Sequence, residues 1–181
     1  MKRLLLLRHA KACRDKPGLS DIDRTLTDRG RADAIRMGHF LKEEALAPEA
    51  VLCSPAARTR QTVELILPIL ETPPPVHIVR ELYLAKASKI AETVRHAPTD
   101  AATLMVVGHN PGLEYCARAL ARLPSGGKAR KLYDVMTEKF STAALAVIGF
   151  DIAEWSAVEP GMGTLELFLR PKDLHADAED D

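Results

Sequence analysis

The sequence has no excess of charge of either sign, because its 181 residues include 25 Lys and Arg side chains and 25 Asp and Glu side chains. Binding nucleic acid without sequence preference needs clustered positive charge that neutralises phosphates. The balance therefore argues against nucleic acid as a partner. Acidic residues gather in residues 177–181, and without them the rest of the chain is slightly basic. We expect this slightly basic part of the chain to bind small anions.

Long apolar runs are also missing. The run Leu4–Leu7 is interrupted by Arg8, so it is too short for a membrane helix or for the apolar core of a signal peptide. No other stretch is long enough to span a bilayer, so we expect no membrane as a partner and a cytoplasmic location. Cysteine is scarce as well: Cys13, Cys53 and Cys116 are odd in number and lack metal-ligand spacing. We expect reduced thiols in or near a core.

The chain does have short apolar runs that alternate with helical patterns. The apolar runs predict strands at residues 4–7, 50–53, 76–79, 103–107, 143–150 and 164–169. The intervening patterns predict helices at residues 28–45, from a point after Pro55 to residue 70, and at residues 87–96 and 113–123. Thr27 is a candidate N-cap, and Pro68 should kink or end the second helix. Residues 124–128 are expected to form a flexible loop, which has neither the spacing nor the preceding strand of a phosphate-binding loop.

This alternation predicts an α/β fold. Strand–helix–strand units give a mostly parallel sheet with helices on both faces, so we expect a single three-layer domain. The last two strands are expected to be antiparallel neighbours across a turn at Gly161–Gly163. The sequence shows no internal repeat and no linker. We place the domain at residues 1–172 and expect an acidic, disordered tail at residues 173–181.

Candidate phosphate-binding side chains follow three of the predicted strands. Arg8 and His9 end the first strand, Arg58 follows the second, and His109 follows the strand at residues 103–107. Parallel strands bring their carboxyl ends to one edge of the sheet, where ligands of such folds bind. Two guanidinium groups could hold a phosphoryl group, a neutral imidazole could attack it, and a protonated imidazole could bind its oxygens. Such a site needs no metal and no other cofactor. Lys11 could add positive potential at its mouth or be simply solvated.

The same residues resemble the motifs of a known family. Residues 8–11 (Arg-His-Ala-Lys) are similar to the Arg-His-Gly signature of the histidine phosphatase superfamily, which includes the cofactor-dependent phosphoglycerate mutases. Alanine stands where glycine is usual, as it does in the small SixA-like branch of phosphohistidine phosphatases. Three further segments resemble motifs of that branch, in the family's order: residues 23–30 (Asp-Arg-Thr-Leu-Thr-Asp-Arg-Gly), 54–62 (Ser-Pro-Ala-Ala-Arg-Thr-Arg-Gln-Thr) and 108–111 (Gly-His-Asn-Pro). The resemblance covers the chain from the first strand to the helix after residue 111.

The resemblance implies a phosphoglycerate mutase-like fold and a role for each position. His9 would be the nucleophile that is transiently phosphorylated, while Arg8, Arg58 and His109 would bind the phosphoryl oxygens. Arg24 would be the additional phosphate-binding arginine of the SixA-like branch. Glu81 aligns with the superfamily's general acid, although the glycine and the Trp-Glu-Gly that often follow it are missing here.

The chain is short, and no segment is long enough to form a cap over the site. An open site would admit phosphohistidine on a partner protein, whose imidazole leaving group needs little help from a general acid. We therefore expect a metal-independent phosphatase that acts on a phosphohistidine domain.

Other functions stay open at this point. A small phosphoester could be the substrate on the same scaffold. A catalytically silent module could bind phosphate or a phosphoprotein, although His9 is present. A metal site on His9 and His109 would have to tolerate the nearby arginines. The oligomeric state is not predicted.

Overall fold

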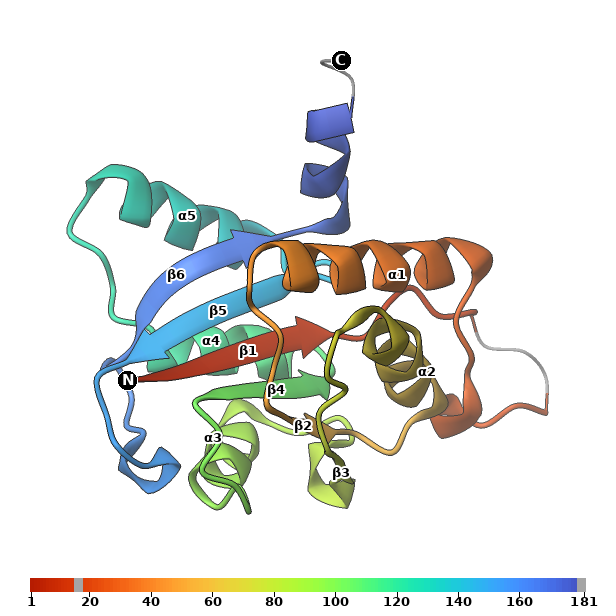
Figure 1. Ribbon diagram of the computed structural model, residues 1–181, viewed down its shortest axis with the longest axis horizontal. Coiled ribbons are helices and arrows are strands. Elements are labelled where there is room, and N and C mark those ends of the chain that lie inside the picture. The colour runs from red at the N-terminus through yellow and green to blue at the C-terminus, as the bar shows by residue number, and fades with distance from the viewer. Residues whose placement is uncertain (15–17, 179–181) are drawn as a thin grey trace.

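Strands and helices alternate along the chain in the computed structural model, which describes residues 1–14 and 18–178, with backbone alone at 175–178 (Figure 1). The strands are β1 (Lys2–Arg8), β2 (Ala50–Cys53), β3 (Val76–Ile78), β4 (Thr103–Gly108), β5 (Leu145–Phe150) and β6 (Thr164–Leu169). The α-helices are α1 (Asp28–Glu43), α2 (Ala57–Ile66), α3 (Ala87–Arg95), α4 (Gly112–Leu120) and α5 (Gly127–Glu138).

The strands form a six-stranded sheet in the order β3-β2-β4-β1-β5-β6. β1 pairs in parallel with β4, and β2 pairs in parallel with both β4 and β3. β5 runs antiparallel to β1 and β6, so the two last strands are antiparallel neighbours as predicted. The mostly parallel α/β fold is thus confirmed.

Side chains that alternate along the strands bury against helices on both faces of the sheet. Leu5 and Leu7 of β1 pack in one core with α1 and α2, whereas Leu4 and Leu6 pack in the other with α3, α4 and α5. Figure 1 shows these helices around the central strands. A strand buried on both faces must be apolar throughout, which explains the leucine run.

Local signals set two of the helix ends. The Thr27 hydroxyl accepts a hydrogen bond from the Gly30 N–H at 3.0 Å, so Thr27 is the N-cap of α1 as predicted. The second helix ends at Ile66, two residues before Pro68, and continues only as a short 3₁₀ helix at Leu67–Ile69.

The structure differs from the predictions in the last third of the chain. α5 begins at Gly127, inside the segment predicted to be a flexible loop, and its Met136 is fully buried. The connection between β5 and β6 runs through a 3₁₀ helix at Trp155–Ala157 and is longer than the predicted turn. A 3₁₀ helix at Pro171–Ala178 occupies the first part of the predicted tail, and residues 179–181 lie outside the described residues. The boundary at residue 172 stays a prediction.

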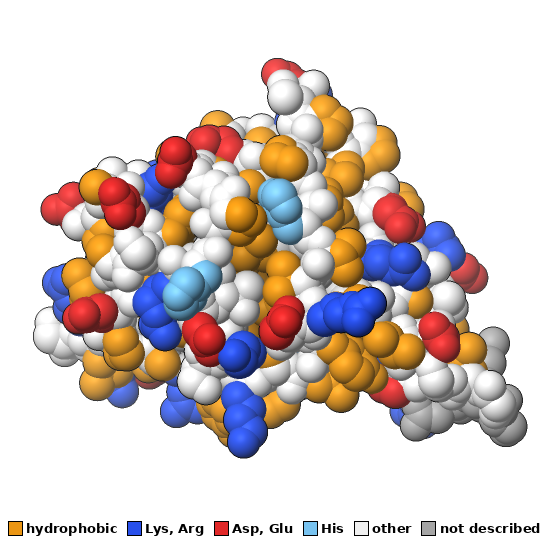
Figure 2. Space-filling view, turned by 90° about the horizontal axis from the view of Figure 1, so that it is seen from below, with side chains coloured by type: hydrophobic (Ala, Val, Ile, Leu, Met, Phe, Trp, Pro, Cys, Tyr) orange, Lys and Arg blue, Asp and Glu red, His pale blue; other side chains and the backbone are white. Residues whose placement is uncertain are grey.

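Charged side chains of both signs are interspersed on the face that Figure 2 shows. None of the described helices has the length and apolar content needed to cross a membrane. All three cysteines fall within the described ranges and are free thiols, with Cys53 and Cys116 buried.

Candidate active site

The two histidines meet because they follow neighbouring strands. Arg8 and Gly108 are register partners at the ends of β1 and β4, so His9 and His109 come next to each other with ring centroids 5.3 Å apart. Arg58 lies in the first turn of α2, directly after β2. Together with Arg8 and Arg24 these side chains line a pocket of about 260 Å³, called here the His9 pocket. The structure thus brings together five of the six predicted site residues.

His9 is held as a neutral imidazole with a defined tautomer. Its Nδ1 lies 2.7 Å from the Ala10 carbonyl oxygen, which can only accept, so Nδ1 carries the proton. Burial lowers the pKa of His9 to about 4, and the charges of Arg58 and Arg8 act in the same direction. At neutral pH the Nε2 lone pair is therefore available for attack on phosphorus.

His109 is also neutral, which differs from the protonated imidazole expected from the sequence. Burial, followed by the neighbouring His9 and Arg58, lowers the pKa of His109 to about 3. The Nη2 of Arg58 lies 3.3 Å from Nδ1 and can only donate, so the imidazole proton is on Nε2, 2.7 Å from the Ser54 hydroxyl oxygen. A phosphoryl dianion would add negative charge beside the ring and so favour its protonation.

Arg58 is fixed by Asp21, a residue that the sequence analysis did not single out. Only 3% of Arg58 is exposed, and its Nη1 donates to the Asp21 carbonyl oxygen at 2.6 Å. Its Nη2 donates to the Asp21 carboxylate at 3.0 Å, and Arg24 donates to the other carboxylate oxygen at 2.9 Å. The Tyr83 hydroxyl also donates to this carboxylate. The hydrogen bond from Tyr83, then those from Arg58 and Arg24, hold the pKa of Asp21 well below its usual range, although burial opposes them.

Arg8 enters the pocket from the end of β1. Its Nη1 donates to the Phe140 carbonyl oxygen at 2.8 Å, while its Nε is buried and has no hydrogen-bond partner in the described part of the chain. Burial lowers the pKa of Arg8 and Glu114 partly offsets this, yet a guanidinium keeps its charge in proteins. Arg8 therefore brings a positive charge to the lining of the His9 pocket.

Gln61 and Thr62 are the last two residues of the motif at residues 54–62, and they position the loop after β1. The Thr62 hydroxyl accepts from the Ala10 N–H at 3.0 Å, and the Gln61 side-chain oxygen accepts from the Leu26 N–H at 2.9 Å. α2 therefore holds both ends of the segment that brings His9 and Arg24 to the pocket. These two residues were quoted in the motif without a role of their own.

Glu81 is the one predicted site residue that does not line the His9 pocket. It lies in a short 3₁₀ helix at Arg80–Leu82, is exposed, and lines another cavity together with Lys89 and His96. The 3₁₀ turn buries Leu82 and directs Tyr83 to the site instead, where the Tyr83 ring packs edge-on against His109 at 5.6 Å. Glu81 thus lies apart from the lining of the His9 pocket, and its role as the general acid stays a prediction.

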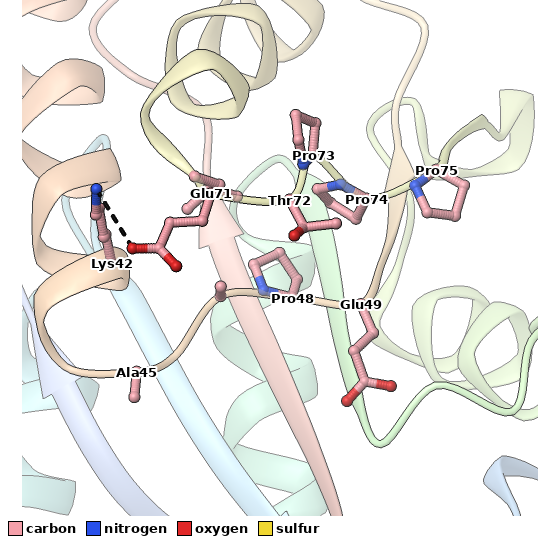
Figure 3. Close-up of a pocket in the computed structure, with 11 residues that line it drawn as sticks. Lys42, Ala45, Pro48, Glu49, Glu71, Thr72, Pro73, Pro74 and Pro75 are labelled. Carbon is pink, nitrogen blue, oxygen red and sulfur yellow. Dashed lines mark ion pairs between the residues drawn. The ribbon is translucent and has the colours of Figure 1, made fainter.

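Another cavity of the surface is larger than the His9 pocket. A cavity of about 550 Å³ at the amino ends of β2 and β3 is lined by Pro73, Pro74 and Pro75 and by the ion pair of Lys42 with Glu71, 3.7 Å apart (Figure 3). It lies at the edge of the sheet opposite the His9 pocket. Within residues 1–14 and 18–174, no three His, Cys, Asp or Glu side chains are grouped so that they could hold a metal ion.

Comparison with known proteins agrees with this geometry. The profile of the histidine phosphatase superfamily (branch 1) matches residues 4–83. An uncharacterized protein of Mycobacterium tuberculosis, Rv1276c, is 34% identical over 166 residues, which cover 92% of this chain and 100% of the relative. The structure of a proposed phosphohistidine phosphatase SixA from Nakamurella multipartitia superposes with a TM-score of 0.80 at 30% identity and covers 94% of this chain and 96% of that one. The phosphohistidine phosphatase SixA of Escherichia coli K12 is 26% identical over 174 residues, which cover 95% of this chain and 96% of the relative.

The chain therefore belongs to the histidine phosphatase superfamily, and its activity is that of a phosphatase. Within the superfamily it is similar to the SixA phosphohistidine phosphatases over nearly its whole length.

Proposed function

We propose that this phosphatase hydrolyses phosphohistidine on a partner protein, through a phosphohistidine intermediate on His9 and without a metal ion. The observation that supports it most is the state of His9, a neutral imidazole whose Nδ1 proton is bound to the Ala10 carbonyl. Its nucleophilic nitrogen lies in a pocket that Arg8 and Arg58 also line. Proteins named phosphohistidine phosphatases have the same fold and similar sequences.

The reaction would proceed in two displacements. The other ring nitrogen of the substrate's phosphohistidine takes a proton from the solvent, the Nε2 lone pair of His9 attacks phosphorus, the P–N bond of the substrate breaks, and the partner's histidine leaves as a neutral imidazole. Water then attacks phosphorus, the P–Nε2 bond breaks, and phosphate and a proton are released to the solvent while His9 regains its lone pair. Arg8 and Arg58 offset the charge on the equatorial oxygens in both steps.

The position of Glu81 favours a phosphohistidine over a phosphoester. An alkoxide leaving group needs a positioned acid, whereas an imidazole can be protonated before the P–N bond breaks. Glu81 lies outside the His9 pocket, and the ionised Asp21 carboxylate holds no proton to give. A phosphohistidine, whose leaving group does not need a positioned acid, therefore suits the residues of the His9 pocket better than a phosphoester does.

Trapping tests the nucleophile. Wild type and His9→Ala are incubated with a labelled phosphodonor and quenched early, with His39→Ala as the control because His39 is an exposed histidine on α1. We expect acid-labile, base-stable label on wild type and His39→Ala and none on His9→Ala. Label that survives the loss of His9 would contradict the mechanism.

Substrate preference tests the rest of the proposal. Turnover of a phosphohistidine protein is compared with that of sugar and nucleotide phosphates, with and without a chelator. We expect the phosphohistidine protein to be preferred and the chelator to have no effect. A strong preference for the small esters would establish the small-molecule alternative, and chelator-sensitive activity restored by zinc would establish a metal site.

A further inference from the structure

A second pocket, of about 390 Å³, adjoins the His9 pocket and is called here the basic pocket. The two pockets share Arg8, Lys11 and Thr142 among their lining residues. The basic pocket is formed where four separate parts of the chain meet: the end of β1, the first turns of α1, the segment between α5 and β5, and the segment after β6. The basic pocket is therefore an extension of the active site that several parts of the chain form together, and not a groove along one helix.

The lining of the basic pocket is positively charged. Its cations are Arg8, Lys11, Arg29, Lys139, Arg170 and Lys172. Asp33 is the acidic residue of the lining, and it is already paired with Arg36 at 2.9 Å and lies 3.8 Å from Arg29. The chain has no net charge as a whole, so this concentration of one sign beside the reacting groups is local.

The lysines supply most of the charges of the lining that stay exposed to the solvent. The Arg170 guanidinium forms two hydrogen bonds with the Asp173 carboxylate, at 2.9 and 3.0 Å. Lys11, Lys139 and Lys172 are exposed and form no ion pair within the part of the chain that the structure describes. The Arg170 fork is thus engaged with a carboxylate, and flexible ammonium groups face the solvent.

From this arrangement we infer that the basic pocket binds carboxylate side chains of the phosphorylated partner, next to the phosphohistidine. The inference rests on the proposed function and names what the partner must present: an acidic surface around the modified histidine. Exposed ammonium groups attract an acidic protein surface over a distance and tolerate several geometries, whereas a second phosphate is best bound by a free planar fork.

Charge reversal in the basic pocket tests the inference. The substrates are two chemically phosphorylated histidine peptides, one with Asp and Glu around the phosphohistidine and one with Asn and Gln in the same positions. Lys139→Glu/Lys172→Glu is compared with Lys128→Glu, an exposed lysine in the first turn of α5, at the other end of the helix that precedes Lys139. The readout is the ratio of kcat/KM for the acidic peptide to that for the neutral peptide, so a general change in activity cancels.

We expect wild type and Lys128→Glu to prefer the acidic peptide, and the double variant to lower the ratio about fivefold to tenfold. Added salt should lower the ratio in wild type more than in the double variant. A ratio of one in wild type, or one unchanged by the double variant, would overturn the inference while hydrolysis of both peptides leaves the proposed function standing. Hydrolysis of neither peptide would overturn both.

Competition with inorganic triphosphate tests whether the basic pocket binds a second phosphate group instead of carboxylates. We expect triphosphate to inhibit wild type and the double variant with constants that differ by less than about twofold, because it would bind at the arginines of the His9 pocket, which neither substitution changes. Inhibition that depends on Lys139 and Lys172, without any preference for the acidic peptide, would show a second phosphate subsite and overturn the inference.

Discussion

The His9 pocket and the basic pocket are both lined by cations, but they hold them in opposite ways. In the His9 pocket Arg58 is buried and three of its hydrogen bonds go to Asp21 and His109. In the basic pocket Lys139 and Lys172 are exposed and unpaired among the described residues. Buried, oriented donors stabilise charge that develops at a fixed point, whereas exposed charges mainly affect encounter and selectivity. Arg58 therefore serves the reaction itself, whereas Lys139 and Lys172 serve the choice of the partner.

Replacing the buried fork should have the largest effect. We expect Arg58→Lys to lower kcat/KM roughly 10³-fold, because lysine can neither span Asp21 and His109 nor bind two phosphoryl oxygens in one plane. The matched control is Arg60→Lys, an exposed arginine two positions further along α2. Steady-state kinetics on one phosphohistidine peptide measures both variants. Near-normal activity of Arg58→Lys would show that charge alone is enough in the His9 pocket and would remove the contrast between the pockets.

The segment around Lys11, which lines both pockets and is called here the Lys11 loop, provides the next test. A Cβ added at Gly30 would lie 2.1 Å from the Lys11 carbonyl oxygen, which accepts a hydrogen bond from the Thr27 N–H at 2.9 Å. We expect Gly30→Ala to lower the free energy of unfolding by about 2–3 kcal/mol, although alanine favours a helix, because the backbone of Lys11 must move. Urea denaturation measures this.

Gly126→Ala is the matched control for the Lys11 loop. A Cβ at Gly126 meets nothing within 4 Å, so we expect a change of less than about 0.5 kcal/mol. Equal effects of the two substitutions would mean that the Lys11 loop adjusts freely and does not fix the boundary between the pockets.

Acid should act on the His9 pocket through its buried imidazoles. The pKa of His9 is lowered to about 4 and that of His109 to about 3, against about 6.5 in an unfolded chain. Between these values the unfolded state binds more protons, so stability falls as pH decreases below about 6.5. We expect a loss on the order of 4 kcal/mol between about pH 7 and about pH 5, about 2 kcal/mol from each imidazole, measured by urea denaturation.

The double variant His9→Gln/His109→Gln isolates this contribution, because its carboxylates titrate as in wild type. We expect its stability to depend less on pH over the same interval. An unchanged slope would show that the imidazoles are not held neutral by burial, and the two pockets would then differ less than their geometry indicates.

Much of the fold and of the site could be predicted because the signals are short-range. The leucine run of β1 and the polar residues after β1, β2 and β4 are local patterns, and the parallel sheet then brings these ends together. Asp21 and Tyr83 were missed because their importance depends on contacts with Arg58 across 37 residues and with Asp21 across 62 residues. α5 was missed because two glycines and many charges obscured the apolar positions Leu132, Val135 and Met136, which are spaced as on one helix face.

The position of Glu81 depends on a local turn that its spacing in the sequence does not reveal. Consecutive residues of a 3₁₀ helix point about 120° apart, so the turn at Arg80–Leu82 decides which side chain faces the site. Tyr83 is two positions after Glu81, and Tyr83 is the one that contacts Asp21 and His109. Alignment by spacing alone could not distinguish them.

Glu81→Gln should accordingly have the smallest effect. Because Glu81 is exposed and lies outside both the His9 pocket and the basic pocket, we expect kcat/KM to change by less than about twofold for a phosphohistidine peptide. The same variant is measured on a phosphoester, whose alkoxide would reveal a missing proton donor. A tenfold loss confined to the phosphoester would mean that Glu81 reaches the reacting group when an ester is bound. Glu81 would then supply a proton that the residues lining the His9 pocket do not supply. The argument that the leaving group favours phosphohistidine over a phosphoester would be weaker as a result.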